Sequence, residues 1–126
     1  MDKAQALHSF WSSFGLTAID EQSAYDTTIT LPSNYITYEV MTSNIAAAPV
    51  ALTASLWYKS TSWEAITKKA DQIAAYIGYG GKVLPVTGGY LWVHLGSTPF
   101  AQRMATEDDS LRRVVLNYTV DFLTAT

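Results

Sequence analysis

The C-terminal stretch "LRRVVLNYTVDFL", residues 111–123, is the longest alternating run of side chains in the chain. A period of two over this length predicts a long β-strand with one buried face. The buried positions are continuous enough for the middle of a sheet, which needs a neighbouring strand on each side and a layer of structure over its apolar face. The two sets of alternating residues are Arg112, Val114, Leu116, Tyr118, Val120 and Phe122, and Leu111, Arg113, Val115, Asn117, Thr119 and Asp121.

Further strands are predicted elsewhere in the chain. The segments "YITYEVM" (residues 35–41) and "VALTASLWYK" (residues 50–59) both alternate, and the connection between them can join antiparallel neighbours. "KVLPV", the turn Thr87-Gly88-Gly89 and "YLWVHLG" predict a β-hairpin, because the glycines allow positive φ. Pro85 lacks an N–H, so the first arm of this hairpin is expected at a sheet edge.

Two helices are predicted from the spacing of apolar residues. The first runs from Asp2 to Phe14 and stops at Gly15. The second covers residues 62–77, where Thr61 and Glu64 have the spacing of a capping box. Its apolar stripe is Trp63, Ile66, Ala70, Ile73, Ala74 and Ile77. Residues 16–34 have no firm period; "DTTIT" within them is either a short strand or part of a long crossing loop.

These elements predict an α+β fold for residues 1–126, taken as a single domain. Its core is one mostly antiparallel sheet, with the N-terminal helix and the central helix packed on one face. A chain of 126 residues suits one domain with one core. With 48% hydrophobic and 15% charged residues, its composition is not that of a disordered segment.

Charge and composition narrow the classes of function. The net charge of −3 argues against tight binding of nucleic acid, which requires a basic face. Cysteine is absent, which excludes disulfides, thiol catalysis and cysteine metal sites. The N-terminus lacks the apolar run of a signal peptide, and no segment reaches the roughly 18 apolar residues of a membrane helix. We therefore expect a soluble protein made in the cytoplasm, with no membrane partner.

Motifs that carry chemistry are not found. His8 and His94 are isolated, without the spacing of metal ligands. The glycine-rich stretches "GYGG" and "TGGY" match neither phosphate-binding loop, and no GxSxG motif is present. The acids of "EDD" are adjacent, whereas an acid/base pair needs two separated and differently buried groups. The sequence therefore predicts no enzyme, no catalytic residue, no cofactor and no metal.

The connection from Gly96 to Arg113, "GSTPFAQRMATEDDSLRR", is the strongest candidate for a functional surface. Ordered loops this long in small domains tend to be functional or mobile. Its apolar residues either fold back over the core or become buried in a neighbouring subunit, with a polar rim around them. Because the two arginines of the last strand point to opposite faces, at least one can pair with an acid of the loop or of another copy. The candidate interface residues are Phe100, Arg103, Met104, Glu107, Asp108, Asp109, Arg112 and Arg113.

A family resemblance extends over nearly the whole chain. In order, it rests on "FWSSF", "LPSNYITYEV", "ASLWYKSTSWEAITKKADQIAAYIG" and "GGYLWVHLGSTPFAQRMATEDDSLRRVVLNYTVDFL". Together these segments resemble the small tail-terminator (tail-completion) proteins of long-tailed bacteriophages. None of the segments is a catalytic signature, and the family supplies no residue-level site, so the interface residues above follow from pattern alone.

The resemblance implies an α+β structural protein that forms a ring, typically a hexamer, of identical subunits. Such a ring caps the tail tube at its head-proximal end, stops tube growth and joins the tail to a head-neck connector or stopper protein. It implies assembly in the host bacterial cytoplasm and a place in the virion, with DNA passing through the ring without specific binding. Two alternatives stay open: another neck component, such as a head-side connector or stopper, and a small-ligand-binding α+β domain with an aromatic pocket.

Overall fold

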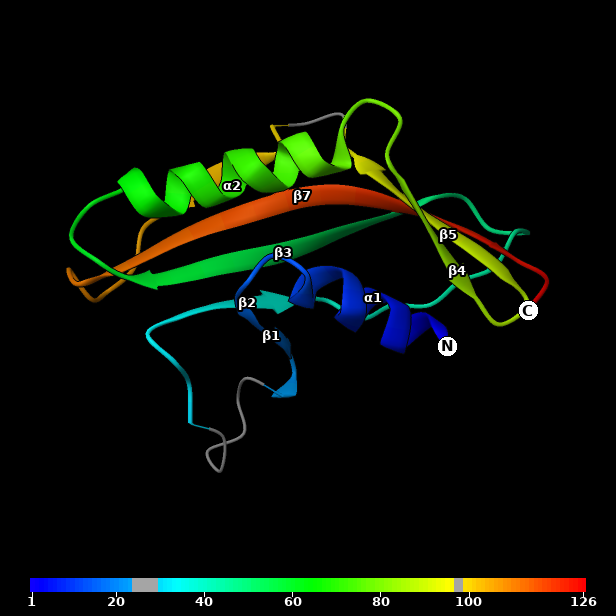
Figure 1. The fold of residues 1–126 in the computed structure, drawn as a ribbon, viewed down its shortest axis with the longest axis horizontal. Coiled ribbons are helices and arrows are strands. Elements are labelled where there is room, and N and C mark those ends of the chain that lie inside the picture. Colours follow the sequence, from blue (N-terminus) through cyan, green and yellow to red (C-terminus); the bar gives the residue numbers. More distant parts are fainter. Residues whose placement is uncertain (24–29, 97–98) are drawn as a thin grey trace.

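A computed structural model describes residues 1–23, 30–96 and 99–126 of the chain (Figure 1). Within these ranges, neither helix has the length and apolar character needed to cross a lipid bilayer. In chain order, the elements are α1 (Lys3–Ser12), β1 (Thr17–Asp20), β2 (Asn34–Tyr38), β3 (Val50–Lys59), α2 (Glu64–Ile77), β4 (Lys82–Val86), β5 (Gly89–Leu95), β6 (Ala101–Met104) and β7 (Leu111–Thr124).

All of these strands belong to one sheet with the order β1-β2-β3-β7-β5-β4, and β6 pairs with β7 beside this path. β1 and β2 are parallel, whereas every other pair is antiparallel. The long strand β7 lies between β3 on one side and β5 and β6 on the other. The predicted α+β fold with a mostly antiparallel sheet and a central C-terminal strand is confirmed.

Both helices pack on the same face of the sheet, and α2 lies lengthwise along β7 (Figure 1). Trp11 of α1 meets Tyr118 of β7 edge-on, with ring centroids 5.1 Å apart. Phe10 reaches Tyr76 of α2, so the two helices share one core. The predicted inward residues of β7 from Val114 to Phe122 are all buried, as are Ile66, Ala70, Ile73 and Ile77 of α2.

A side-chain capping box marks the start of α1, and a glycine with positive φ follows its end. The Asp2 carboxylate accepts a hydrogen bond from the Gln5 N–H, and the Gln5 side chain accepts one from the Asp2 N–H. This reciprocal capping box satisfies two of the free N–H groups at the start of the helix. Gly15, with φ of 80°, provides the left-handed conformation that turns the chain toward β1.

The start of α2 differs from the prediction. The helix begins at Glu64 with Trp63 at the N-cap position, and Trp63 makes no side-chain capping bond. Thr61 is therefore not the cap, and the expected capping box with Glu64 is wrong. The Ser62 hydroxyl instead accepts a hydrogen bond from the Glu64 N–H at 3.1 Å. Trp63, which occupies the N-cap position two residues after the expected cap Thr61, is partly buried and packs against the core.

The predicted hairpin is confirmed as β4 and β5. Gly88 has φ of 85° at the turn, a conformation that few residues other than glycine adopt. Pro85 lies on β4, the last strand of the path, which confirms its expected position at an edge.

Two short strands were not expected from the sequence. β1 (Thr17–Asp20) falls in the stretch without a firm period, and β6 (Ala101–Met104) falls in the connection that was expected to be a loop. Most of "DTTIT", the segment considered for a strand, lies outside the described residues. Each of these short strands pairs with one other strand and forms a lateral edge of the sheet.

Candidate functional site

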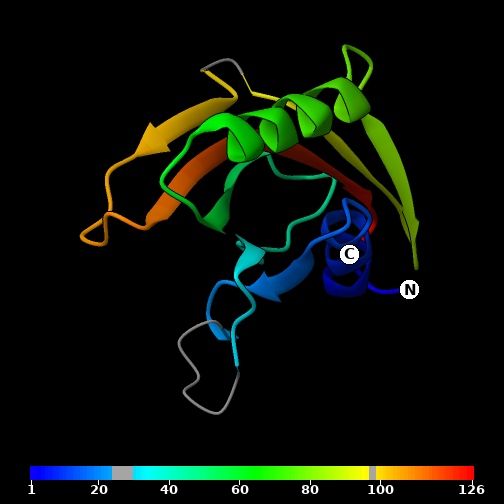
Figure 2. The same ribbon diagram turned by 60° about the vertical axis from the view of Figure 1, so that its left-hand side comes forward.

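The connection between β5 and β7 is an arm at one end of the sheet. We define the arm as residues 99–113, which include β6, the following loop and the first residues of β7. Figure 2 shows β6 and the loop at the left of the molecule, on the opposite side from α1. All four residues of β6 are exposed. The arm is thus a paired strand with an exposed loop at its tip. The expectation of a long loop was wrong for residues 101–104, which form β6.

Phe100 anchors the base of the arm to the fold. Its side chain is partly buried and packs against the hydrophobic core. Its carbonyl accepts a hydrogen bond from the Asn117 N–H at 2.7 Å. The Asn117 side chain also donates to the Pro99 carbonyl and to the Gln102 side chain, both at 3.0 Å. Of the two alternatives for Phe100, folding back over the core is the one seen in the chain.

Met104 lies at the other end of β6 and is 40% exposed. It stands opposite Arg113 on β7, and therefore on the sheet face that carries no helix. Met104 is an exposed large apolar side chain among the mostly polar residues of the arm. A surface residue of this kind suits the apolar part of a protein contact.

The two arginines that face α2 share one aromatic side chain. The Cζ atom of Arg103 lies 4.9 Å from the ring centroid of Trp63, and that of Arg112 lies 5.2 Å from it. At these distances both guanidiniums interact favourably with the indole face. Arg112 also donates to the main-chain carbonyls of Thr61 at 2.8 Å and Asp109 at 2.9 Å. The bond to Thr61 joins the arm to the segment that leads into α2, and the bond to Asp109 lies within the arm.

Arg113 lies on the opposite face, as its position in the alternating strand predicts. Its Cζ atom lies 4.7 Å from the ring centroid of Trp57, and its guanidinium donates to the Ser55 hydroxyl. Trp57 is itself stacked on Tyr35, with the two rings inclined by only 13°. Register therefore aligns Tyr35, Trp57, Arg113 and Met104 in one row across four strands.

Every arginine of the chain thus lies in the arm and contacts a tryptophan ring. Within residues 1–23, 30–96 and 99–126, none of these guanidiniums forms an ion pair with a carboxylate. Arginine stacked on an aromatic ring keeps N–H donors in its plane that can bind an anion. The arm therefore offers positive charge that the described part of the chain does not neutralise.

The acidic run forms the exposed tip of the arm. The Asp108 carboxylate accepts hydrogen bonds from the Ser110 hydroxyl at 2.7 Å and from the Ser110 N–H at 2.9 Å. These bonds hold the pKa of Asp108 below its ordinary value, chiefly through the Ser110 hydroxyl. Glu107 and Asp109 are exposed, and neither carboxylate is paired with a cation in the part of the chain that the structure describes. Asp108 thus shapes the turn, while its two neighbours carry charge at the surface.

The sequence did not indicate that Trp57 and Trp63 belong to this site. Trp57 lies in a predicted strand and Trp63 in the predicted apolar stripe of a helix, and neither was predicted to contact the arm. A signal was present in the pattern of β3: Trp57 falls on the polar side of its alternation, where an aromatic residue is left without core contacts.

The two histidines lie apart from the arm. His94 Nε2 is 2.7 Å from a carboxylate oxygen of Asp121, and the His94 ring lies 4.3 Å from that of Trp92. His8 Nδ1 is 2.8 Å from the Tyr38 hydroxyl. Across the described ranges, no three His, Asp or Glu side chains gather as a metal-binding group.

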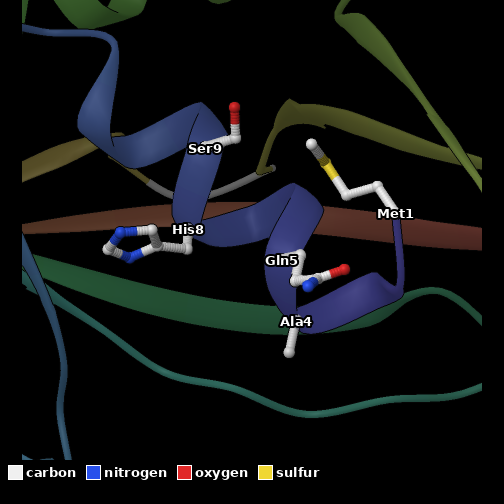
Figure 3. Close-up of a pocket in the computed structure, with 5 residues that line it drawn as sticks. All are labelled: Met1, Ala4, Gln5, His8 and Ser9. Atoms are coloured by element: carbon white, nitrogen blue, oxygen red, sulfur yellow. The ribbon is translucent and has the colours of Figure 1, made fainter.

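Two surface hollows lie around α1. One of about 690 Å³ is lined by Met1, Ala4, Gln5, His8 and Ser9 along the exposed side of the helix (Figure 3). Its side chains do not converge: His8 points to one side of the helix and Met1 lies on the other. Another, of about 420 Å³, includes the aromatic residues Phe10 and Tyr76 and is open to solvent. A site for a small ligand is usually concave, mostly apolar and has a few converging polar groups. These hollows do not have that form.

Comparison with known proteins adds no assignment to this geometry: no family model, curated protein or solved structure matches the chain.

Proposed function

We propose that this chain is a structural subunit of a phage tail terminator. In this proposal identical subunits form a ring, a hexamer by resemblance, at the head-proximal end of the tail. The ring caps the tube, stops its elongation and provides the surface that joins a head-neck connector or stopper protein. Its partners are further copies of the chain, the tail tube protein and the neck protein, and DNA passes through the ring without specific binding.

The observation that supports this best is the composition of the arm. Among the residues that the structure describes, Arg103 and Arg113 form no ion pair with a carboxylate, and Glu107 and Asp109 form none with a cation. A ring uses heterologous contacts, in which one patch of a subunit meets a different patch of the next. A surface with both signs of charge and an exposed Met104 suits such repeated contacts.

Individual exposed charge pairs are weak, at about 0–1 kcal/mol each. A closed ring repeats each contact at every interface, so weak terms add up over the assembly. An exposed and mostly polar arm can therefore stabilise a ring, because its weak contacts are repeated at every interface between subunits.

The proposal is tested with headless tails from the phage that encodes this chain, prepared without the chain itself. The purified protein is added and the tails are imaged by negative-stain electron microscopy. A terminator binds one end of each tube as a ring. Binding to isolated heads but not to tubes would instead identify a head-side connector or stopper. Binding to neither would contradict a role at the head-tail junction.

A further inference from the structure

β1 and β6 are the two lateral edges of one ribbon of sheet. The registers of successive strand pairs align β1, β2, β3, β7 and β6 in four continuous rows. Each row begins at a residue of β1 and ends at a residue of β6. The rows are Thr17-Tyr35-Trp57-Arg113-Met104, Ala18-Ile36-Leu56-Val114-Arg103, Ile19-Thr37-Ser55-Val115-Gln102 and Asp20-Tyr38-Ala54-Leu116-Ala101.

The outer edge of β6 presents main-chain groups at alternate residues. The Phe100 carbonyl accepts from the Asn117 N–H, so Phe100 faces β7 with its main-chain groups. In an antiparallel pair, this orientation alternates along the strand. Ala101 and Arg103 therefore direct their N–H and C=O groups away from β7.

A corresponding contact shows which residues of β1 direct their main-chain groups away from β2. The Glu21 N–H donates to the Tyr38 carbonyl at 2.8 Å, so Glu21 and Ile19 face β2 with their main-chain groups. Ala18 and Asp20 then face outward. Within the described residues, the outward groups of Ala18, Asp20, Ala101 and Arg103 have no hydrogen-bond partner.

The remaining edge of the sheet, β4, is less suited to pairing. Pro85 is the fourth of the five residues of β4 and has no N–H to donate. Proline on an edge strand is a common means by which proteins prevent strand addition. Neither β1 nor β6 contains a proline.

We propose that β6 of one copy pairs with β1 of the next copy, so that the sheet continues from subunit to subunit. The inference rests on the proposed ring and specifies how the ring is joined. β1 and β7 run in one direction and β6 in the other, so a neighbour with its strands oriented alike presents β1 antiparallel to β6. Continuing the rows places Ala101 opposite Asp20 of the partner subunit, and Arg103 opposite Ala18 of the partner subunit. Both pairs consist of residues whose main-chain groups face outward, so they satisfy one another.

Charge favours this pairing over pairing of β6 with itself. Arg103 and Asp20 project from the same sheet face, because their rows are two residues apart. Across the proposed interface they become diagonal neighbours, which lie within reach of a long side chain. Two β6 strands paired through their outward residues would instead bring Arg103 diagonal to its own copy, and like charges oppose that contact. Pairing of β6 with β1 is also heterologous, as a ring requires.

The experiment uses the double variant Thr17→Cys/Met104→Cys. The two residues end the same row, and in the proposed interface they form a directly opposed pair without hydrogen bonds to each other. The Cα atoms of such pairs are about 4.5 Å apart, within the range for a disulfide. Within one chain they are separated by four strand spacings, about 19 Å, which excludes an intramolecular bond. Thr17 and Met104 are both exposed, so their replacement should leave the core unchanged. The natural chain has no cysteine, so only the two introduced thiols can form a disulfide.

Oxidation of this variant at high protein concentration should give a ladder of covalent oligomers on a non-reducing gel, ending in a closed species. Each single-cysteine variant should stop at the dimer. The matched control Val83→Cys/Met104→Cys, which moves one cysteine to the exposed edge strand β4, should give no ladder. The charge variants Arg103→Glu and Asp20→Lys, each placed in the Thr17→Cys/Met104→Cys background, should each reduce the ladder, and their combination should restore it.

The native mass of the wild-type protein tests ring formation separately from the pairing of β6 with β1. A closed ring in solution or on tail tubes, together with no ladder from Thr17→Cys/Met104→Cys, would overturn the strand pairing and leave the ring intact. A chain that forms no ring on its own or on tubes, and gives no ladder, would overturn both.

Discussion

The guanidinium of Arg112 lies over the indole of Trp63, with its Cζ atom 5.2 Å from the ring centroid. Arg112 belongs to the central strand of the sheet, and Trp63 is the N-cap residue of α2. The contact therefore connects the end of the arm to the start of the helix. The Arg112 bond to the Thr61 carbonyl reinforces this connection over 51 residues of sequence.

Replacement of Arg112 by alanine should loosen the arm and destabilise the protein by about 1–3 kcal/mol, because a charged hydrogen-bond donor and a cation–π contact are lost together. Urea unfolding measures the change in stability, and hydrogen exchange reports opening of residues 99–111. As a matched control, Lys68→Ala removes an exposed ion pair with Glu64 and should change stability by at most about 0.5 kcal/mol. Equal effects of the two substitutions would show that Arg112 is an ordinary surface residue.

Replacement of Ile73 by alanine tests the packing of α2 on the sheet. Ile73 is completely buried in the core, so removal of its side-chain carbons should cost about 2–5 kcal/mol. Urea unfolding should show a lower midpoint with an unchanged slope. Gln72→Ala, one position earlier and exposed, serves as the control and should be nearly neutral. An unchanged midpoint for Ile73→Ala would remove α2 from the core.

The Asp108 turn predicts a specific pH dependence. Because hydrogen bonds from Ser110 lower the pKa of Asp108 below its ordinary 3.8, the ionised carboxylate favours the folded turn. This contribution is present above the ordinary pKa and is lost as the pH falls through the lower folded-state pKa. Substitution Ser110→Ala should raise the pKa of Asp108 toward its ordinary value, as followed by NMR titration of the carboxyl carbon. No change in the pKa would show that the Ser110 hydroxyl is not its main partner.

The exposed acids of the arm should matter for assembly and little for folding. The double variant Glu107→Ser/Asp109→Ser leaves the Asp108 turn in place, and loop charges of this kind rarely affect stability by more than about 0.5 kcal/mol. We expect unfolding curves like those of the wild type, but weaker binding to tail tubes in a sedimentation assay. Lowering the salt concentration should strengthen wild-type binding more than that of the variant. Full binding by the variant at all salt concentrations would show that the acids are only a solvated tip.

Long periodic elements were predictable from the sequence, because many residues contribute to each pattern. The alternation of residues 111–123 gave the strand, its central position and the opposite directions of Arg112 and Arg113. The stripe of α2 gave its buried face. β1 and β6 were missed because each has four residues, too few to establish a period, and β6 has no buried side that would reveal one.

The candidate site was predictable only in outline. The location of charged and apolar residues in residues 99–113 could be read directly, but their partners depend on strand register. Contact of Arg113 with Trp57 requires β3 and β7 to align over a separation of more than fifty residues, which no local pattern encodes. The prediction of the N-cap of α2 was wrong for a related reason. The N-cap residue is Trp63, which packs against the core and two arginines that lie far away in the sequence.

The length of tail tubes is the sharpest test of the proposed terminator function. Under the proposed function the chain is encoded by a long-tailed phage. Its gene is deleted from that phage, and tail lengths are measured by electron microscopy with and without a complementing copy. We expect overlong tubes without attached heads in the deletion, and tubes of uniform length joined to heads when the wild-type chain is restored. Tails of normal length, joined to heads in the absence of the chain, would contradict the proposed role as a tail terminator.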